Sequence, residues 1–206
     1  MSSKWTKVLT SVGLLLIAAA LALTGYNMID ARRAAEYTTH ALEELNNLIP
    51  ASENTVDRPA GHTEKTADSI NPAKEMPVAV IDGNEYIGRL EIQALSLSLP
   101  VISEWSYPRL KTAPCRYTGS AYQDNLIIAA HNYSSHFGKL SELREGDMIE
   151  FTDIESNRFT YTVTQIEELP GTAIEEMQAG EWDLTLFTCT LGGRSRVTVR
   201  CSRTIG

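Results

Sequence analysis

The sequence predicts a mainly β domain that one N-terminal helix tethers to a membrane. Three features support this prediction: a long uncharged apolar run near the N-terminus, a polar stretch with several prolines, and then short segments in which apolar and polar residues alternate. Alternation with a period of two, rich in Val, Ile, Thr, Tyr and Phe, is typical of β-strands. A chain of 206 residues can hold one such domain with its attachments.

The first 29 residues have the pattern of a membrane anchor. Lys4 and Lys7 precede residues 8–29, which include no charged residue. A helix of this length, with a rise of about 1.5 Å per residue, spans a hydrocarbon core of about 30 Å. The preceding lysines predict that residues 1–7 are cytoplasmic and that the chain after the span lies outside the cell membrane. A cleaved signal peptide is the alternative, because small residues follow the apolar core of the run.

Two further segments lead to the β domain. Residues 30–50 are rich in helix formers and end at a proline, which predicts a juxtamembrane helix. Residues 51–77 hold three prolines and few large apolar side chains, the composition of a flexible linker. His40 and His62 stand alone among polar neighbours in these segments, so we expect both to be exposed to solvent. The domain itself is assigned to residues 78–206.

Within this domain the pattern predicts several short strands arranged as a closed or sandwiched sheet. Strands are expected within residues 86–92, 95–102, 125–131, 147–153, 159–169, 183–190 and 196–201. Short helices are expected within residues 137–147, where two leucines share a face, and within residues 173–182.

Composition argues against two classes of function. The formal charge is −8, and no cluster of Lys and Arg offers the phosphate contacts that nucleic-acid binding requires. The acidic residues Glu175, Glu176, Glu181 and Asp183 lack the spacing of a calcium loop. We therefore expect no nucleic-acid partner, no metal site and no cofactor.

Cys189 has the setting of a nucleophile. It stands at the C-terminal end of a predicted strand, just before Gly192 and Gly193, and alternation places it on the face of Phe187, opposite Leu186. A thiol in this position can be partly exposed and rigidly held, as nucleophilic catalysis requires. The alternative is a buried, inert cysteine.

Several motifs resemble those of one family. The segment Thr185-Leu186-Phe187-Thr188-Cys189 resembles the TLxTC signature of sortases. The stretch LIIAAHNYSSHFGKL resembles the strand and turn that carry the sortase histidine, and RSRVTVRC resembles the strand that carries its arginine. These two matches correspond to His131 and Arg196. The stretch YIGRLEIQALSLSLPVI is similar to the opening strands of the family, so the resemblance covers about residues 80–206.

The resemblance implies a closed β-barrel and a cysteine transpeptidase outside a Gram-positive-type cell membrane. Such an enzyme cleaves a C-terminal sorting signal of surface proteins and transfers the acyl group to an amine of a cell-wall precursor or a pilin. Cys189 would form the thioacyl intermediate, His131 would transfer protons, and Arg196 would donate to the oxyanion or to the substrate backbone. Thr188 of the same motif is expected to bind substrate. Two alternatives remain: a cysteine hydrolase with the same site, and a non-enzymatic tethered β-domain.

Other residues compete for two of these roles. His136 is the rival of His131, although His131 ends an apolar strand whereas His136 is expected in a polar loop. Arg194 and Arg200 have the strand parity of Arg196. However, Arg194 lies in an expected loop and Arg200 lies farther along the strand.

The two remaining cysteines are not expected to act in catalysis. Alternation places Cys201 on an inward face with Val197 and Val199. Cys115 follows a proline and is harder to assign. A disulfide between Cys115 and Cys201, which would leave Cys189 free, is a further alternative in an oxidising compartment.

Overall fold

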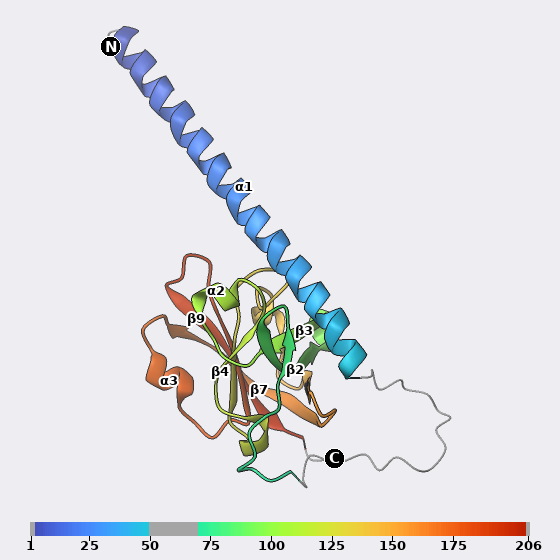
Figure 1. The fold of residues 1–206 in the computed structure, drawn as a ribbon. Helices are drawn as coiled ribbons and strands as arrows, with labels where there is room; N and C mark the ends of the chain where they lie inside the picture. Colours follow the sequence, from blue (N-terminus) through green and yellow to red (C-terminus); the bar gives the residue numbers. More distant parts are fainter. Residues whose placement is uncertain (1–2, 50–69, 205–206) are drawn as a thin grey trace.

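The computed structural model describes residues 3–49 and 70–204. In these residues a long N-terminal helix lies against a β-barrel (Figure 1). Most of the expected linker, including His62, lies outside the described residues. His40 is exposed, as expected.

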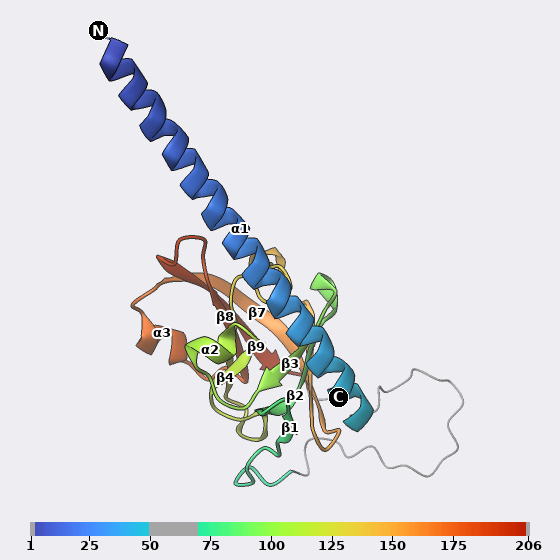
Figure 2. The same ribbon diagram turned by 45° about the horizontal axis from the view of Figure 1, so that its top comes forward.

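The N-terminal helix α1 (Ser3–Leu48) is continuous across the expected membrane span and the expected juxtamembrane helix. Its most apolar window of 18 residues has a mean hydropathy of 2.2, and none of that window is buried inside the protein. Figures 1 and 2 show the N-terminal half of α1 projecting away from the barrel, whereas its C-terminal half runs alongside it. By length and composition, α1 could therefore cross a membrane.

The C-terminal half of α1 packs on the barrel through a stripe of small and aliphatic side chains. Its buried residues recur at intervals of three or four, which places them on one face of a helix. They are Ala34, Thr38, Ala41 and Leu45, and Ile49, directly after the helix, continues the stripe.

The described residues form a nine-stranded sheet in the order β1-β2-β3-β4-β5-β8-β9-β7-β6. Because β6 also pairs with β2, eight strands close into a barrel and β1 is added beside β2. The expected closed barrel is therefore confirmed. The strands are β1 (Ala79–Ile81), β2 (Asn84–Ile92), β3 (Leu97–Ile102), β4 (Cys115–Thr118), β5 (Leu126–Ala129), β6 (Met148–Asp153), β7 (Arg158–Pro170), β8 (Leu184–Cys189) and β9 (Ser195–Arg203).

The strands expected from alternation correspond to β2, β3 and β5 to β9, whereas β1 and β4 were not expected. β1 has only three residues, and β4 lacks the continuous apolar run by which the equally short β5 was expected. The helical segments are short: α2 (Tyr107–Leu110), α3 (Ile174–Gln178) and the 3₁₀-helices η2 (Gln93–Leu95), η3 (Ala121–Gln123) and η4 (Leu140–Glu142). The helix expected within 137–147 is reduced to η4, which ends where Leu143 takes an extended conformation with φ −62° and ψ 160°.

Two apolar cores lie on the two faces of the barrel wall. The interior core includes Leu90, Phe151 and Leu186, among others. The outer core lies between the barrel, the C-terminal half of α1 and the short helices, and it includes Leu45 and Phe187. Phe187 and Leu186 are neighbours on β8, so that strand contributes to both cores by alternation.

Candidate active site

Cys189 is the last residue of β8 and is exposed, whereas the five residues before it are buried. It shares the outer face of the barrel with Phe187, two residues earlier. The connection to β9 turns through Gly192 and Gly193, whose φ values of +90° and +70° favour glycine. The amide of Thr190 donates to Ser195 O at 2.9 Å and closes this turn. The thiol is thus accessible on a rigidly held strand end.

Arg196 is the direct cross-strand partner of Cys189 in the antiparallel pair β8–β9. Directly opposed residues project from the same face of a sheet, so the guanidinium and the thiol lie on one side of the wall. The guanidinium carbon lies 6.0 Å from the centroid of the Phe187 ring, within cation–π range. Its Nη1 is buried and has no hydrogen-bond partner among the described residues. This donor is therefore available to an acceptor that enters the site.

His131 comes next to Cys189 through the parallel pair β5–β8. Ala129 is the register partner of Phe187, and the amide of Ala130 donates to Phe187 O at 3.2 Å. His131 and Cys189 each lie two residues beyond the Ala129–Phe187 pair. Cys189 is thus at the end of β8 and His131 just beyond the end of the adjacent strand β5, and both are on the same face. The site thus draws Cys189, His131 and Arg196 from three neighbouring strand segments.

The imidazole of His131 is partly buried, and this burial lowers its pKa below the ordinary value. The positive charge of Lys111 lowers this pKa further, whereas the negative charge of Asp30 raises it. We therefore expect His131 to be neutral at neutral pH and able to accept a proton.

Thr188 is buried, with 4% of its surface exposed, and its hydroxyl donates to Ala130 O at 2.8 Å. This bond connects the end of β8 to the residue before His131. The expected role of Thr188 in substrate binding stays a prediction.

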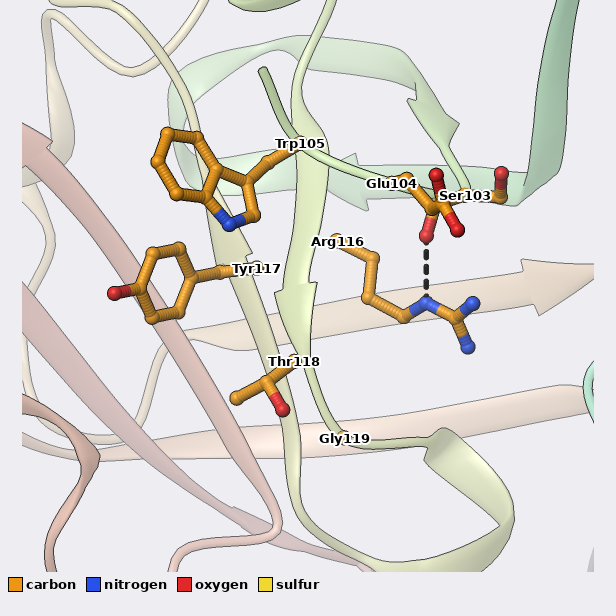
Figure 3. A pocket seen from close by; sticks show the side chains of 7 residues that line it. All are labelled: Ser103, Glu104, Trp105, Arg116, Tyr117, Thr118 and Gly119. Carbon is orange, nitrogen blue, oxygen red and sulfur yellow. Dashed lines mark hydrogen bonds between the residues drawn. The ribbon is translucent and has the colours of Figure 1, made fainter.

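Beside this face, β3 and β4 diverge after a single pair, Ile102 and Cys115, and leave a cavity of about 440 Å³. Its lining includes Ser103, Glu104, Trp105, Arg116, Tyr117 and Thr118 (Figure 3). Nε of Arg116 donates to Ser103 O at 2.7 Å across the gap.

A row of aromatic rings connects this cavity to the predicted nucleophile. The ring centroids of Trp105 and Tyr117 are 5.3 Å apart, and Tyr117 meets Phe187 edge to face, also at 5.3 Å. Phe187 in turn lies beneath the guanidinium of Arg196. Sequence reasoning missed Trp105 and Tyr117. Their signal was two aromatic residues in polar, turn-rich segments, where no core was expected.

Comparison with known proteins identifies the family. Residues 90–204, more than half of the chain, match the family model of the sortase domain. This chain belongs to the sortase family. Sortase A of Bacillus anthracis is 31% identical over 121 residues, which cover 56% of this chain and 57% of that protein. The match therefore spans little more than half of that relative's length.

Solved sortase structures share the barrel. Sortase C1 of Streptococcus suis has a TM-score of 0.51 at 26% identity, with 59% of this chain and 74% of that chain covered. Sortase C1 of Streptococcus agalactiae has a TM-score of 0.52 at 25% identity, with coverages of 62% and 72%. Sortase C of Streptococcus pneumoniae, at 23% identity, has a TM-score of 0.53 with coverages of 80% and 89%, which shows a common fold.

The rival arginines of this sortase have other surroundings. Arg200 is 2% exposed, and its guanidinium donates to Glu167 Oε1 at 2.8 Å and to the carbonyls of Glu176 and Met177 at 2.7 and 2.5 Å. These contacts hold α3 on the barrel. Arg194 lies exposed in the β8–β9 turn, where its carbonyl accepts from Gly171 N at 2.9 Å.

His136 differs from the expectation of a polar loop. It is fully buried beneath α1, and its Nε2 lies 3.0 Å from Thr38 Oγ1. Burial and the neighbouring His131 lower the pKa of His136 to about 4. The expectation failed because sequence gave no sign that α1 covers this loop.

The three cysteines of the sortase domain are free. Cys201 belongs to the interior core, as expected from its parity, whereas Cys115 belongs to the outer core. These two thiols lie on opposite faces of the barrel wall, so the alternative disulfide between them is not formed. Burial raises the pKa of each to about 12. Cys189 is thus the exposed thiol of the three.

The acidic residues near α3 have separate roles. The Asp183 carboxylate accepts from the amide of Arg203 at 2.5 Å, and the carbonyl of Glu176 accepts from Arg200. Within the part of the chain that the structure describes, no three or more His, Cys, Asp or Glu side chains gather as metal ligands.

Proposed function

We propose that this sortase is a membrane-anchored cysteine transpeptidase. It cleaves a C-terminal sorting signal of surface proteins and transfers the acyl group to an amine of a cell-wall precursor or a pilin. The adjacency of Cys189, His131 and Arg196 at the ends of β8, β5 and β9 is the observation that carries this proposal. Membership of the sortase family supports it.

The acylation step uses all three side chains. Neutral His131 takes the proton of the Cys189 thiol as Sγ attacks the scissile carbonyl carbon. The carbonyl oxygen becomes an oxyanion, to which the free Nη1 of Arg196 donates. The tetrahedral intermediate collapses when the His131 imidazolium protonates the departing amine. A thioester on Cys189 remains, and His131 is neutral again.

The transfer step reverses these proton movements. The incoming amine attacks the thioester carbon and gives a proton to His131. The second tetrahedral intermediate expels the Cys189 thiolate, which takes this proton back. An amide has then formed, and the thiol and the neutral imidazole are restored.

The candidate site lies close to the end of the apolar run of α1, as expected for an enzyme that acts at a membrane surface. Asp30 is the first charged residue after the apolar run, and its carboxylate lies 3.2 Å from Nζ of Lys111, just after α2. His131 lies close enough for both charges to affect its pKa. We therefore propose a single-pass protein with residues 1–7 inside, residues 8–29 in the membrane, and residues 30–50 leading to an external catalytic domain that begins near residue 78.

Substrate binding is proposed along the outer face beside Cys189. The aromatic row from Trp105 through Tyr117 offers apolar contacts to a peptide near the thiol. Thr188 contributes by fixing the backbone of Ala130 and thus the wall next to the scissile bond.

A thioacyl adduct is the direct test. The full chain in detergent micelles is incubated with a library of sorting-signal peptides, and tryptic peptides are analysed by mass spectrometry. We expect an acyl group on Cys189 and none in the Cys189→Ala variant. An adduct that yields only free acid with every amine favours the hydrolase. If no library peptide acylates Cys189 although the thiol reacts with alkylating agents, the enzymatic proposal is wrong.

A further inference from the structure

We propose that Thr38, in the anchor helix α1, is a positioning residue for His131, so that the extramembrane half of this helix forms part of the active site. The inference rests on the proposed role of His131 in proton transfer. Its starting point is the contact between α1 and the loop of residues 131–138, which carries His131 at one end and His136 near the other.

Thr38 makes two contacts from a buried position. Its Oγ1 donates to Thr112 O at 3.2 Å and lies 3.0 Å from Nε2 of His136. A hydroxyl has one hydrogen, so the bond to the carbonyl leaves Oγ1 to accept from an Nε2–H. This contact favours the Nε2–H tautomer of His136, whose ring also interacts with the backbone of Ala34 in α1.

The loop between the two histidines is closed on itself. The amide of Phe137 donates to His131 O at 3.1 Å, and the amides of His136 and Gly138 both donate to Tyr133 O at 2.9 Å. Gly138 is so tightly packed that a Cβ there would lie 2.6 Å from Asn132 O. Residues 131–138 thus move as a unit, and a shift at His136 is passed to His131.

Side-chain packing follows the same path. The ring of Tyr133 lies between the two histidines, with its centroid 5.1 Å from that of His131 and 5.5 Å from that of His136. The series Thr38, His136, Tyr133 and His131 is therefore continuous from the anchor helix to the proposed proton-transfer group.

A second contact joins α1 to the other side of the site. Asp30 forms an ion pair with Lys111, and Thr38 holds the carbonyl of the next residue, Thr112. The loop and the segment after α2 are both tied to one face of α1. The charge of Lys111 lowers the pKa of the partly buried His131, and the charge of Asp30 raises it.

Thr38 can be separated from the docking of the helix itself. Ala41, Leu45 and Ile49 bury an apolar stripe, and Asn46 Oδ1 accepts from Nη1 of Arg89 at 2.5 Å. These contacts keep α1 on the barrel when the Thr38 hydroxyl is removed. Loss of the Thr38 hydroxyl is therefore expected to free the loop of residues 131–138 from α1 while the protein stays folded.

The test compares three variants of the full chain in detergent micelles. Thr38→Val removes the hydroxyl at nearly constant side-chain shape, whereas Thr38→Ser keeps the hydroxyl. Thr39→Val is the matched control, because Thr39 is exposed and its hydroxyl donates to Ala35 O within the helix. We measure kcat and KM for transfer from an active sorting peptide, and the NMR titration of the His131 ring with selectively labelled histidine.

Thr38→Val is expected to lower kcat about ten- to a hundredfold with little change in KM, the cost of a misplaced reacting group. The titration midpoint of His131 should rise toward the ordinary histidine value as the released loop gains solvent. Thr38→Ser and Thr39→Val should match the parent protein in both measurements. Weaker packing of α1 that left the loop of residues 131–138 in place would not shift the titration midpoint of His131.

The proposal is overturned if folded Thr38→Val keeps the parent kcat and the parent His131 titration, or if Thr39→Val loses as much activity. If Thr38→Val does not fold, His136→Phe replaces it. This change removes the ring nitrogen that contacts Thr38 Oγ1 and keeps a ring of similar size. An unchanged kcat together with an unchanged His131 midpoint contradicts the coupling. The titration needs no substrate, so failure of Cys189 acylation rejects the transpeptidase without deciding the role of Thr38.

Discussion

The hydroxyl of Thr188 donates to the carbonyl of Ala130 across the ends of β8 and β5. These residues immediately precede Cys189 and His131, so one buried hydrogen bond fixes the spacing of the proposed nucleophile and proton-transfer group. It explains why a threonine serves at this position, where its side chain is hidden from the surface.

Thr188→Val should therefore impair activity more than its conservative nature suggests. The change leaves the Ala130 carbonyl without this partner, which should lower the free energy of unfolding by about 1–3 kcal/mol. We also expect kcat/KM to fall about tenfold or more, because the two strand ends lose their fixed spacing. Peptide turnover and chemical denaturation measure the two effects. Thr164→Val, on the exposed face of β7, is the control and should change neither.

Alkylation should distinguish the three cysteines. Cys189 is exposed, whereas burial raises the pKa values of Cys115 and Cys201 to about 12. Thiolates are the reactive species, so iodoacetamide at pH 7.5 should modify Cys189 in the folded protein and the other two only after denaturation. Peptide mapping by mass spectrometry identifies the modified cysteines.

Cys189→Ala should abolish turnover, and Cys115→Ala and Cys201→Ala should leave the chemical step largely intact. Full activity in Cys189→Ala contradicts the proposed mechanism.

Alanine substitutions of the arginines in and next to β9 should affect either activity or stability, depending on the residue. Arg196→Ala should lower kcat/KM by about 10² or more, as should His131→Ala, since each removes a group that is proposed to act in the transition state. Arg194→Ala should be milder, because Arg194 is exposed in the turn. Arg200→Ala should instead lower the free energy of unfolding by roughly 2–4 kcal/mol through loss of its buried bonds to α3. Thermal melts and turnover assays on the same samples separate the two classes. The reverse order for Arg194 and Arg196 would contradict the assignment.

Acid should weaken the docking of α1. The pKa of His136 is lowered to about 4 in the folded protein, whereas an unfolded histidine titrates near 6.5. The unfolded state therefore binds more protons between these values, so stability is complete above pH 6.5 and falls as the pH decreases toward 4. The loss at pH 5 should reach about 2 kcal/mol from this residue. His131 and the Asp30–Lys111 pair face the same region and can also respond to acid. The contribution of His136 is therefore measured as the difference between the parent protein and a variant that lacks this histidine.

His136→Gln supplies that difference, because an amide can donate to Thr38 but does not titrate near neutral pH. Hydrogen exchange of residues 30–49 at pH 7 and pH 5 measures the docking. Parent protein should lose protection at pH 5 more than the variant does. Equal losses in both would assign the acid sensitivity to other groups.

Much of this fold was predictable because seven of the nine strands are marked by period-two alternation or, in the short strand β5, by a continuous apolar run. The short strand β4 was not, since Cys115–Thr118 gains its pairing from neighbours that are distant in sequence. The face of Cys189 and the inward position of Cys201 follow from strand parity alone, whereas parity could not show that Arg200 binds α3, because it places Arg200 on the same face as Arg196. The buried setting of His136 does not, because a helix nearly a hundred residues earlier covers it. Sequence patterns record which face of an element is apolar, but not which element covers it.

The fate of the acyl group is the last prediction. A thioester on Cys189 reacts with water as well as with amines, so net transfer requires a bound acceptor whose effective concentration exceeds the competition from water. The proposed tethering of the site near the membrane surface would suit acceptors held there. We expect glycine-terminated or diaminopimelate-type peptides to divert product from free acid to ligated amide, with some hydrolysis when no acceptor is present. Chromatography and mass analysis across several amines measure the ratio of amide to acid. His131→Ala should depress both products, because the acceptor must lose a proton as it attacks. Exclusive hydrolysis with every amine, together with a demonstrated Cys189 adduct, would assign this sortase to the hydrolases.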